Sequence, residues 1–179
     1  MLSVVELLPL LDGWVLRKGN GGPDKLGPGE TLEMVKVRES GWLALAKMTV
    51  DNPYVGLRIA VGDPYGNVYE YSFRVYDAYE DGLVMPNPAV WLTRYDDEAK
   101  VYVLYHLGPT PYHGPLRIEA VNTLGRDVTV REWGYMLYAV VDEERFARSL
   151  QRLLGTAAQP EKPWYRGRWP QVIAGPLRV

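Results

Sequence analysis

Residues 55–75 read Val-Gly-Leu-Arg-Ile-Ala-Val-Gly-Asp-Pro-Tyr-Gly-Asn-Val-Tyr-Glu-Tyr-Ser-Phe-Arg-Val, and this stretch decides the fold class. Apolar side chains occupy every second position in residues 55–61 and again in residues 69–75, which is the period of a strand with one buried face. Between the two runs, Pro64 presets φ and Gly66 tolerates a positive φ, as a tight turn requires. The stretch therefore predicts an antiparallel β-hairpin.

Similar short apolar segments recur along the chain, with turn residues between them and no helical pattern among them. Further strands are predicted at residues 32–37, 42–50, 90–95, 101–107, 116–121, 128–133 and 135–141. The prolines at 86, 88, 109, 111 and 115 fall outside the predicted strand interiors, as expected because proline cannot donate to a strand ladder. This pattern predicts an all-β fold, an antiparallel β-sandwich of jelly-roll type, with a closed barrel as the alternative.

The period changes after the last predicted strand. Acidic residues open the segment 142–155, Gly155 closes it, and apolar residues recur at helical spacing, which predicts one short amphipathic helix. Its apolar face consists of Phe146, Leu150, Leu153 and Leu154.

The chain thus divides into four predicted segments. Residues 1–30 form an N-terminal segment that ends in a Gly- and Pro-rich connection over 19–30, and residues 31–141 form the sandwich. The helix follows over 142–155. Prolines interrupt residues 156–179, which are predicted to form an extended basic and aromatic arm.

Composition excludes several classes of protein. The 179 residues have no cysteine, so there are no disulfides, no thiol nucleophile and no cysteine-ligated zinc. A net charge of −2 argues against nucleic acid as a partner, and no apolar run is long enough to span a membrane. We expect a soluble domain in a compartment that the sequence does not identify, with no cofactor. The abundance of Pro, Arg, Tyr and Val fits a thermophilic source.

Catalytic patterns are weak. His106 and His113 could share a metal with a carboxylate, but their spacing matches no known ligand set. The acidic groups at 80–81 and 96–98 fall in turns, where neighbouring carboxylates usually point apart into solvent. No serine has a Gly-x-Ser-x-Gly setting. The sequence therefore predicts a protein that is not an enzyme and holds no metal.

The arm over residues 156–179 is unusual in both charge and apolarity. It holds four basic residues and one acidic residue, a balance of +3, which leaves −5 for residues 1–155 of the −2 total. Its aromatic side chains cannot remain in water at no cost, so they must pack on the chain's own domain or on a neighbouring subunit. The predicted subunit-contact residues are Trp164, Tyr165, Arg166, Arg168, Trp169 and Ile173.

Two stretches carry a family resemblance. Residues 40–54 lead from a strand into an Asn-Pro-Tyr turn, and residues 112–122 begin a strand at Gly-Pro-Leu-Arg-Ile. In these stretches the chain resembles β-sandwich and jelly-roll structural proteins from the virions of tailed phages and archaeal viruses. The resemblance implies a non-enzymatic role in a capsid, decoration layer or tail, and location in the virion. It carries over no functional residue.

Three functional hypotheses follow, of which the third is an unrecognised hydrolase, because catalytic residues assemble in space rather than in sequence. The first is a structural subunit whose partners are copies of itself or other structural subunits, contacted through the terminal segments. The second is a carbohydrate-binding module or receptor-binding domain, because exposed aromatic rings on β-sandwiches can stack on sugars. Its candidate residues, each of which could instead belong to the core or its rim, are Trp91, Tyr95, Tyr102 and Tyr112.

Overall fold

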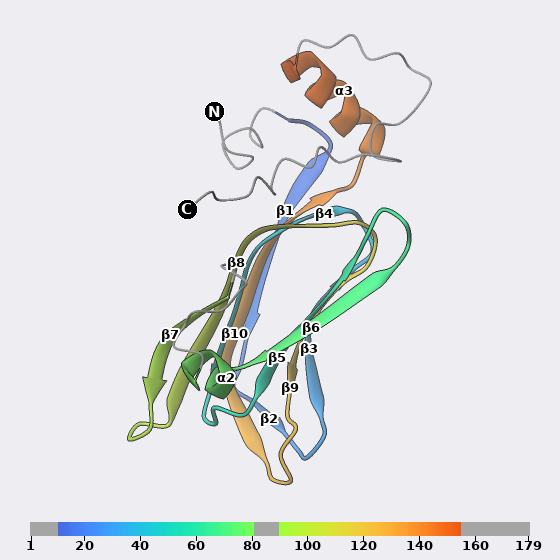
Figure 1. Ribbon diagram of the computed structural model, residues 1–179. Helices are drawn as coiled ribbons and strands as arrows, with labels where there is room; N and C mark the ends of the chain where they lie inside the picture. The colour runs from blue at the N-terminus through green and yellow to red at the C-terminus, as the bar shows by residue number, and fades with distance from the viewer. Residues whose placement is uncertain (1–10, 81–89, 155–179) are drawn as a thin grey trace, which may run out of the picture. The chain divides into compact units, whose positions relative to one another are not determined.

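The computed structural model describes residues 11–80 and 90–154, and antiparallel β-sheet makes up most of them (Figure 1). The side chains of residues 90, 91, 153 and 154 lie outside this description. The chain separates into two compact units rather than one. The larger unit is residues 14–141, and the smaller combines residues 1–13 with residues 142–179.

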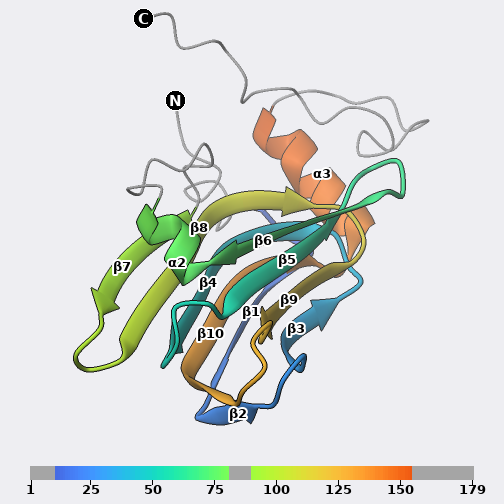
Figure 2. The ribbon, with the colours of Figure 1, turned by 60° about the horizontal axis from the view of Figure 1, so that its bottom comes forward.

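The larger unit is a sandwich of two sheets, which Figure 2 shows as facing layers. The first, the six-stranded sheet, has the order β1-β10-β4-β8-β7, with β2 pairing to β10. Its strands are β1 (Trp14–Gly21), β2 (Asp24–Leu26), β4 (Gly41–Val50), β7 (Val90–Asp96), β8 (Val101–Tyr112) and β10 (Val128–Val140). The second, the four-stranded sheet, contains β3 (Thr31–Val37), β9 (Leu116–Val121), β5 (Gly56–Gly62) and β6 (Val68–Arg74) in that order. The predicted antiparallel sandwich is confirmed.

The core lies between the two sheets and follows the period-two alternation. Leu57 and Ile59 on β5 are fully buried against Met48 on β4 and Leu104 on β8, and Arg58 points to the other face of its sheet. Burying apolar area of this kind contributes about 25 cal/mol per Å² removed from water. This is the main source of stability for a sandwich without disulfides.

The predicted hairpin is confirmed as β5 and β6, with Leu57 opposite Phe73. The Asp63 carboxylate accepts hydrogen bonds from the backbone N–H groups of Tyr65 and Asn67, both at 2.8 Å. Gly66 has φ of +88°, the conformation for which glycine was expected.

The structure corrects the predicted N-terminal segment. Residues 14–21 and 24–26 form β1 and β2, so part of the predicted connection over 19–30 belongs to the six-stranded sheet. Both strands pair with β10, which runs unbroken over the two segments predicted separately as 128–133 and 135–141. The glycines that suggested a loop have a role within the strand. Gly19 and Gly21 lie beside the rings of Tyr135 and Trp133, and a Cβ at either position would clash with the ring.

Strand β8 continues through the predicted turn at Gly108, and Pro109 and Pro111 lie within it. The register with β4 shifts between Leu43 and Leu45 at this point, so the regular ladder that would exclude proline is interrupted. A second difference is α2 (Val75–Glu80), a short helix after β6, where no helix was predicted. Its residues Val75 and Ala78 are buried.

The smaller unit contains α3 (Glu143–Leu154), which confirms the predicted helix. Asp142 caps it by accepting the Arg145 N–H at 2.9 Å, and Phe146 is buried as predicted. Ser149 is buried too, and its hydroxyl is satisfied there because it accepts the backbone N–H of Asp12 and donates to the Phe146 carbonyl. Neither α2 nor α3, the two helices of the described residues, combines the length and apolarity needed to cross a membrane.

Candidate functional site

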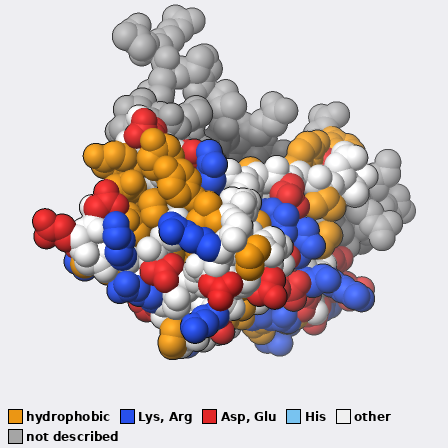
Figure 3. Space-filling view, turned by 90° about the horizontal axis from the view of Figure 1, so that it is seen from below, with side chains coloured by type: hydrophobic (Ala, Val, Ile, Leu, Met, Phe, Trp, Pro, Cys, Tyr) orange, Lys and Arg blue, Asp and Glu red, His pale blue; other side chains and the backbone are white. Residues whose placement is uncertain are grey.

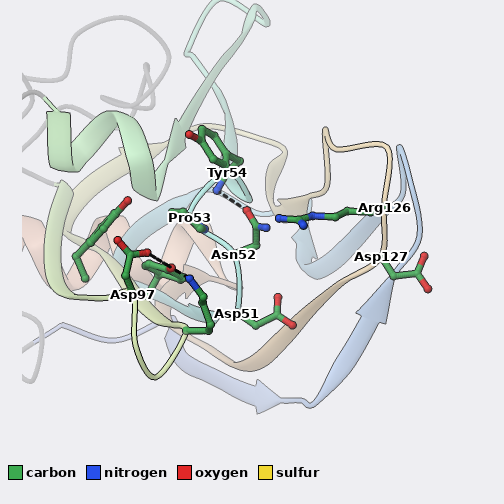
Figure 4. Close-up of a pocket in the computed structure, with 10 residues that line it drawn as sticks. Asp51, Asn52, Pro53, Tyr54, Asp97, Arg126 and Asp127 are labelled. Atoms are coloured by element: carbon green, nitrogen blue, oxygen red, sulfur yellow. Dashed lines mark hydrogen bonds and ion pairs between the residues drawn. The ribbon is translucent and has the colours of Figure 1, made fainter.

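The described residues form an open pocket of about 570 Å³ at one end of the sandwich (Figure 4). Because β4 runs antiparallel to both β8 and β10, its C-terminal end lies beside the beginnings of those two strands. Three turns therefore meet at this end: residues 51–54, residues 96–100 and residues 122–127. They contribute the lining residues Asp51, Asn52, Pro53, Tyr54, Tyr95, Asp97, Lys100, Tyr102, Arg126 and Asp127.

Hydrogen bonds fix the first turn on three sides. Asp51 Oδ1 accepts the Thr129 N–H at 2.8 Å, which ties the turn to β10. Asn52 Oδ1 accepts the Tyr54 N–H at 3.0 Å, and the Pro53 carbonyl accepts the Tyr76 N–H at 2.8 Å. The Tyr54 backbone is thus held between its own turn and α2, and the Tyr54 side chain is 36% exposed.

Asn122 organises the turn that presents Arg126. It is completely buried, and its Nδ2 lies within 3.0 Å of the carbonyl oxygens of Leu26, Gly27 and Arg126. Its Oδ1 accepts the Leu124 N–H at 2.9 Å. One side chain therefore satisfies backbone groups of two separate loops, as buried polar groups require.

The turn between β7 and β8 is held by two aspartates. Asp96 accepts the Ala99 N–H at 2.8 Å and the Arg94 guanidinium at 2.7 Å, and these two bonds lower the pKa of the Asp96 carboxyl. The Tyr102 hydroxyl donates to Asp97 at 2.5 Å. Burial, together with this bond to a carboxylate, raises the pKa of Tyr102.

Five tyrosines gather beside the pocket. Tyr54 stacks on Tyr76 with ring centroids 4.8 Å apart, Tyr79 stacks on Tyr95 at 4.0 Å, and Tyr95 meets the edge of Tyr102 at 5.0 Å. Tyr79 is 52% exposed. Figure 3, which views the molecule from below, shows hydrophobic side chains (tyrosine included) gathered on one side, with acidic and basic side chains around them.

The charged groups of the pocket nearly balance. Three carboxylates, Asp51, Asp97 and Asp127, accompany the cations Lys100 and Arg126. In Figure 4, Arg126 extends toward Asn52, whereas the Asp127 side chain points away from it. Within residues 11–80 and 90–154, no three histidine or acidic side chains come together as metal ligands.

His106 lies elsewhere, in the core between the sheets. Its ring is fully buried, Nε2 lies 3.0 Å from Thr110 Oγ1, and Nδ1 has no hydrogen-bond partner among the described residues. Burial lowers the pKa of His106 to about 4, so the imidazole is neutral at physiological pH. The Tyr71 ring lies 6.2 Å away, and burial raises the pKa of its hydroxyl to about 12.

The structure brings together only part of the predicted sugar-stacking set. Tyr95 and Tyr102 both line the pocket. However, Tyr102 is 1% exposed and Tyr112 is 0% exposed, so the prediction that these two rings stack on a sugar is wrong. Tyr112 donates instead to the Tyr138 carbonyl at 3.3 Å. Both rings fill the interior because they lie on the inward-facing side of β8.

Other predicted residues lie outside the description. The side chain of Trp91 is not described, and neither are residues 155–179, which include all six predicted subunit-contact residues.

Sequence reasoning missed Tyr54 and Arg126 as members of a site. The available signal was three polar turns in the sequence: Asp-Asn-Pro-Tyr at 51–54, Asp-Asp-Glu at 96–98 and Leu-Gly-Arg-Asp at 124–127. Strand order, which was not predictable, decides that these turns share one end.

The chain was compared with known proteins: no protein-family model matches it, and no curated protein matches it.

Proposed function

We propose that this protein is a non-enzymatic structural subunit that associates with copies of itself, most specifically as a component of a virion. The observation that carries the proposal is an apolar outer face on the six-stranded sheet. The virion assignment rests on the sequence resemblance of residues 40–54 and 112–122 to structural proteins of phage and archaeal-virus particles.

The strand register defines this outer face. One row across the sheet aligns Leu16, Tyr138, Trp42 and Pro111 on β1, β10, β4 and β8. The next row aligns Met136, Leu45 and Leu107 on the last three of these strands. Their sequence neighbours Leu43, Ala46 and Leu137 point inward to the core, so these two rows face outward.

Parts of this face are open to solvent. Leu16 is 47% exposed, Leu107 is 42% exposed and Pro111 is exposed as well, whereas Trp42 between them is buried and Leu45, Met136 and Tyr138 are half-buried. Farther along the same face, polar contacts replace the apolar ones, beginning with the 2.8 Å ion pair between Lys47 and Glu132. An apolar area with a charged border is the usual composition of a protein contact surface.

We assign the arm of a second copy as the occupant of this face. Residues 156–179 carry Trp164, Tyr165 and Trp169, the large aromatic side chains that most often anchor interfaces. The arm is also basic, at +3, and the remainder of the chain is acidic, at −5, so net charge favours contact between the arm of one copy and the body of another.

Light scattering or sedimentation of the full chain over a wide range of concentration tests the proposal. The full chain is expected to exceed the mass of the 20.3 kDa monomer. The full-length variants Trp164→Ser, Trp169→Ser, Leu16→Asp and Leu107→Asp should each weaken association by about tenfold or more, the cost of losing an interface anchor.

Val68→Asp is the matched control, because Val68 is also exposed, at 55%, but lies on β6 in the other sheet. It should leave association unchanged. A full chain that stays monomeric at every concentration contradicts the proposal. Association that survives both the arm and the face variants contradicts the assigned contact.

A further inference from the structure

We propose that the pocket formed by residues 51–54, 96–100 and 122–127 binds an uncharged carbohydrate, through a pyranose ring laid against Tyr54. This proposal does not depend on self-association. It rests on the aromatic surface of the pocket, its balanced charge and the rigid turns that carry both.

Tyr54 provides the aromatic surface of the pocket. One face of the Tyr54 ring stacks on Tyr76, at 29° between planes, and the side chain is still 36% exposed. Tyr54 is therefore stacked on one face and still contributes open surface to the pocket. The C–H groups on one side of a pyranose are electropositive and pack on the electron-rich face of such a ring. Tyr76 restricts the movement of the Tyr54 ring, so less conformational freedom is lost on binding.

The polar groups are those that recognise hydroxyls. The Arg126 guanidinium extends toward Asn52, next to Tyr54, and makes no ion pair within the described part of the chain. Its N–H groups can donate to two neighbouring oxygens at once. Asp51 and Asp97 each use Oδ1 within the protein, for Thr129 and Tyr102. A carboxylate has further lone pairs that can accept from a sugar hydroxyl.

The net charge of the pocket favours a neutral sugar over charged small ligands. The lining residues carry three carboxylates against two cations, a net charge of −1. Phosphate, sulfate or uronic-acid groups would be repelled on balance. The described residues also contain no metal-ligand cluster that could bridge an anion to these carboxylates. A ligand with many hydroxyls and no charge satisfies the polar groups without this repulsion.

The pocket also has the dimensions and rigidity of a binding site. Its volume of about 570 Å³ lies within the range of roughly 300–1,000 Å³ common for small-molecule sites. Buried Asn122 and the bonds at Asp51 and Pro53 fix the turns before any ligand arrives. A peptide segment is the competing occupant, but it would need more apolar contact than this pocket offers, because six of the ten lining residues are charged or carry an amide.

Calorimetry and affinity electrophoresis of the full chain test the proposal. The probes are cellohexaose, maltohexaose, xylohexaose, mannohexaose and chitohexaose, with heparin as the charged comparison. At least one neutral hexaose should bind. Tyr54→Ala and Arg126→Ala should each weaken that binding by about tenfold or more, the ratio expected for a lost stacking or bidentate contact. Tyr54→Phe keeps the ring and should retain binding.

Two control variants match these changes. Tyr65→Ala removes an 82% exposed tyrosine from the β5–β6 turn, and Arg38→Ala removes an exposed arginine that does not line the pocket. Both should bind like the unaltered chain. Thermal melting of every variant distinguishes loss of the site from loss of the fold.

Several outcomes would overturn the proposal: no binding to any neutral hexaose, binding that Tyr54→Ala leaves unchanged in a folded protein, or binding to heparin alone. Failure here is distinguishable from failure of the structural role. Pocket variants should leave the solution mass of the chain unchanged, and Leu16→Asp should leave carbohydrate binding unchanged.

Discussion

The Tyr102 hydroxyl donates a 2.5 Å hydrogen bond to Asp97 Oδ1, and this bond joins the core of the sandwich to a turn at the pocket. The Tyr102 ring is packed among the core side chains, whereas Asp97 is 65% exposed. A carboxylate on an exposed turn is thereby held by a side chain that cannot move without disturbing the interior.

Replacing Tyr102 with Phe should destabilise the protein although the ring remains. The bond to a charged acceptor is lost, at a cost of about 1.5–3 kcal/mol in the free energy of unfolding. Urea denaturation measures this change. Tyr65→Phe, at an 82% exposed position, is the control and should change stability by less than about 0.5 kcal/mol. Equal stability of the two variants would show that the bond contributes nothing.

Asn122→Ala should be more damaging. It removes the partner of three carbonyl oxygens and one N–H in the completely buried centre of two loops. Each unsatisfied buried group costs about 1–3 kcal/mol, so a loss of at least 3 kcal/mol is expected. Asn67→Ala is the control, because Asn67 bonds Asp63 on an exposed turn. Similar denaturation midpoints for the two variants would contradict this role of Asn122.

His106 should make stability depend on pH. Burial lowers its pKa from 6.5 to about 4 in the folded state, so between these values the unfolded chain binds more protons. Stability should therefore fall as pH falls from 6.5 toward 4, with about 2 kcal/mol lost between pH 7 and pH 5. In His106→Leu this dependence should largely disappear, whatever its stability at pH 7. Chemical denaturation of both proteins at pH 7 and pH 5 measures this dependence. An equal loss of stability in His106→Leu would contradict the role of His106.

Glu119 and Glu70 provide a comparison within one ion-pair network on the outer face of the four-stranded sheet. Glu119 lies opposite Arg58 in register, is 7% exposed and meets it at 2.6 Å, whereas Glu70 is 45% exposed and lies 3.7 Å from the same guanidinium. Glu119→Ala leaves a partly buried arginine without its main partner and should cost about 3 kcal/mol. Glu70→Ala should cost less than about 1 kcal/mol. The reverse order in chemical denaturation would show that burial does not set the strength of these pairs.

Prediction from the sequence succeeded where the pattern was local. The alternation in residues 55–75 and the spacing of Phe146 and Leu150 each report one face of one element, and the structure contains the corresponding hairpin and helix. It failed at β1, where glycines suggested a loop. The rings of Tyr135 and Trp133 cover Gly19 and Gly21. These rings are distant in the sequence, so the local pattern around the glycines could not predict the contact.

The candidate site shows the same division. An Asn-Pro-Tyr turn at residues 52–54 and an acidic turn at residues 96–98 were visible in the sequence, and so were aromatic residues suited to stacking. The sequence did not show which of these tyrosines would be exposed and which would be buried. Tyr54 and Tyr102 differ because one lies on a turn and the other on the inner side of β8.

The sequence by itself determined that this chain forms antiparallel sheets with alternating faces and a capped amphipathic helix, because side-chain period and turn chemistry act between near neighbours. Only the tertiary structure decided that β4 lies between β8 and β10, which brings three distant turns to one pocket and aligns Trp42 with Tyr138 on one outer face. The physical reason is that strand pairing satisfies the same backbone hydrogen bonds whichever strands are neighbours. The choice among pairings is made by packing of the whole core.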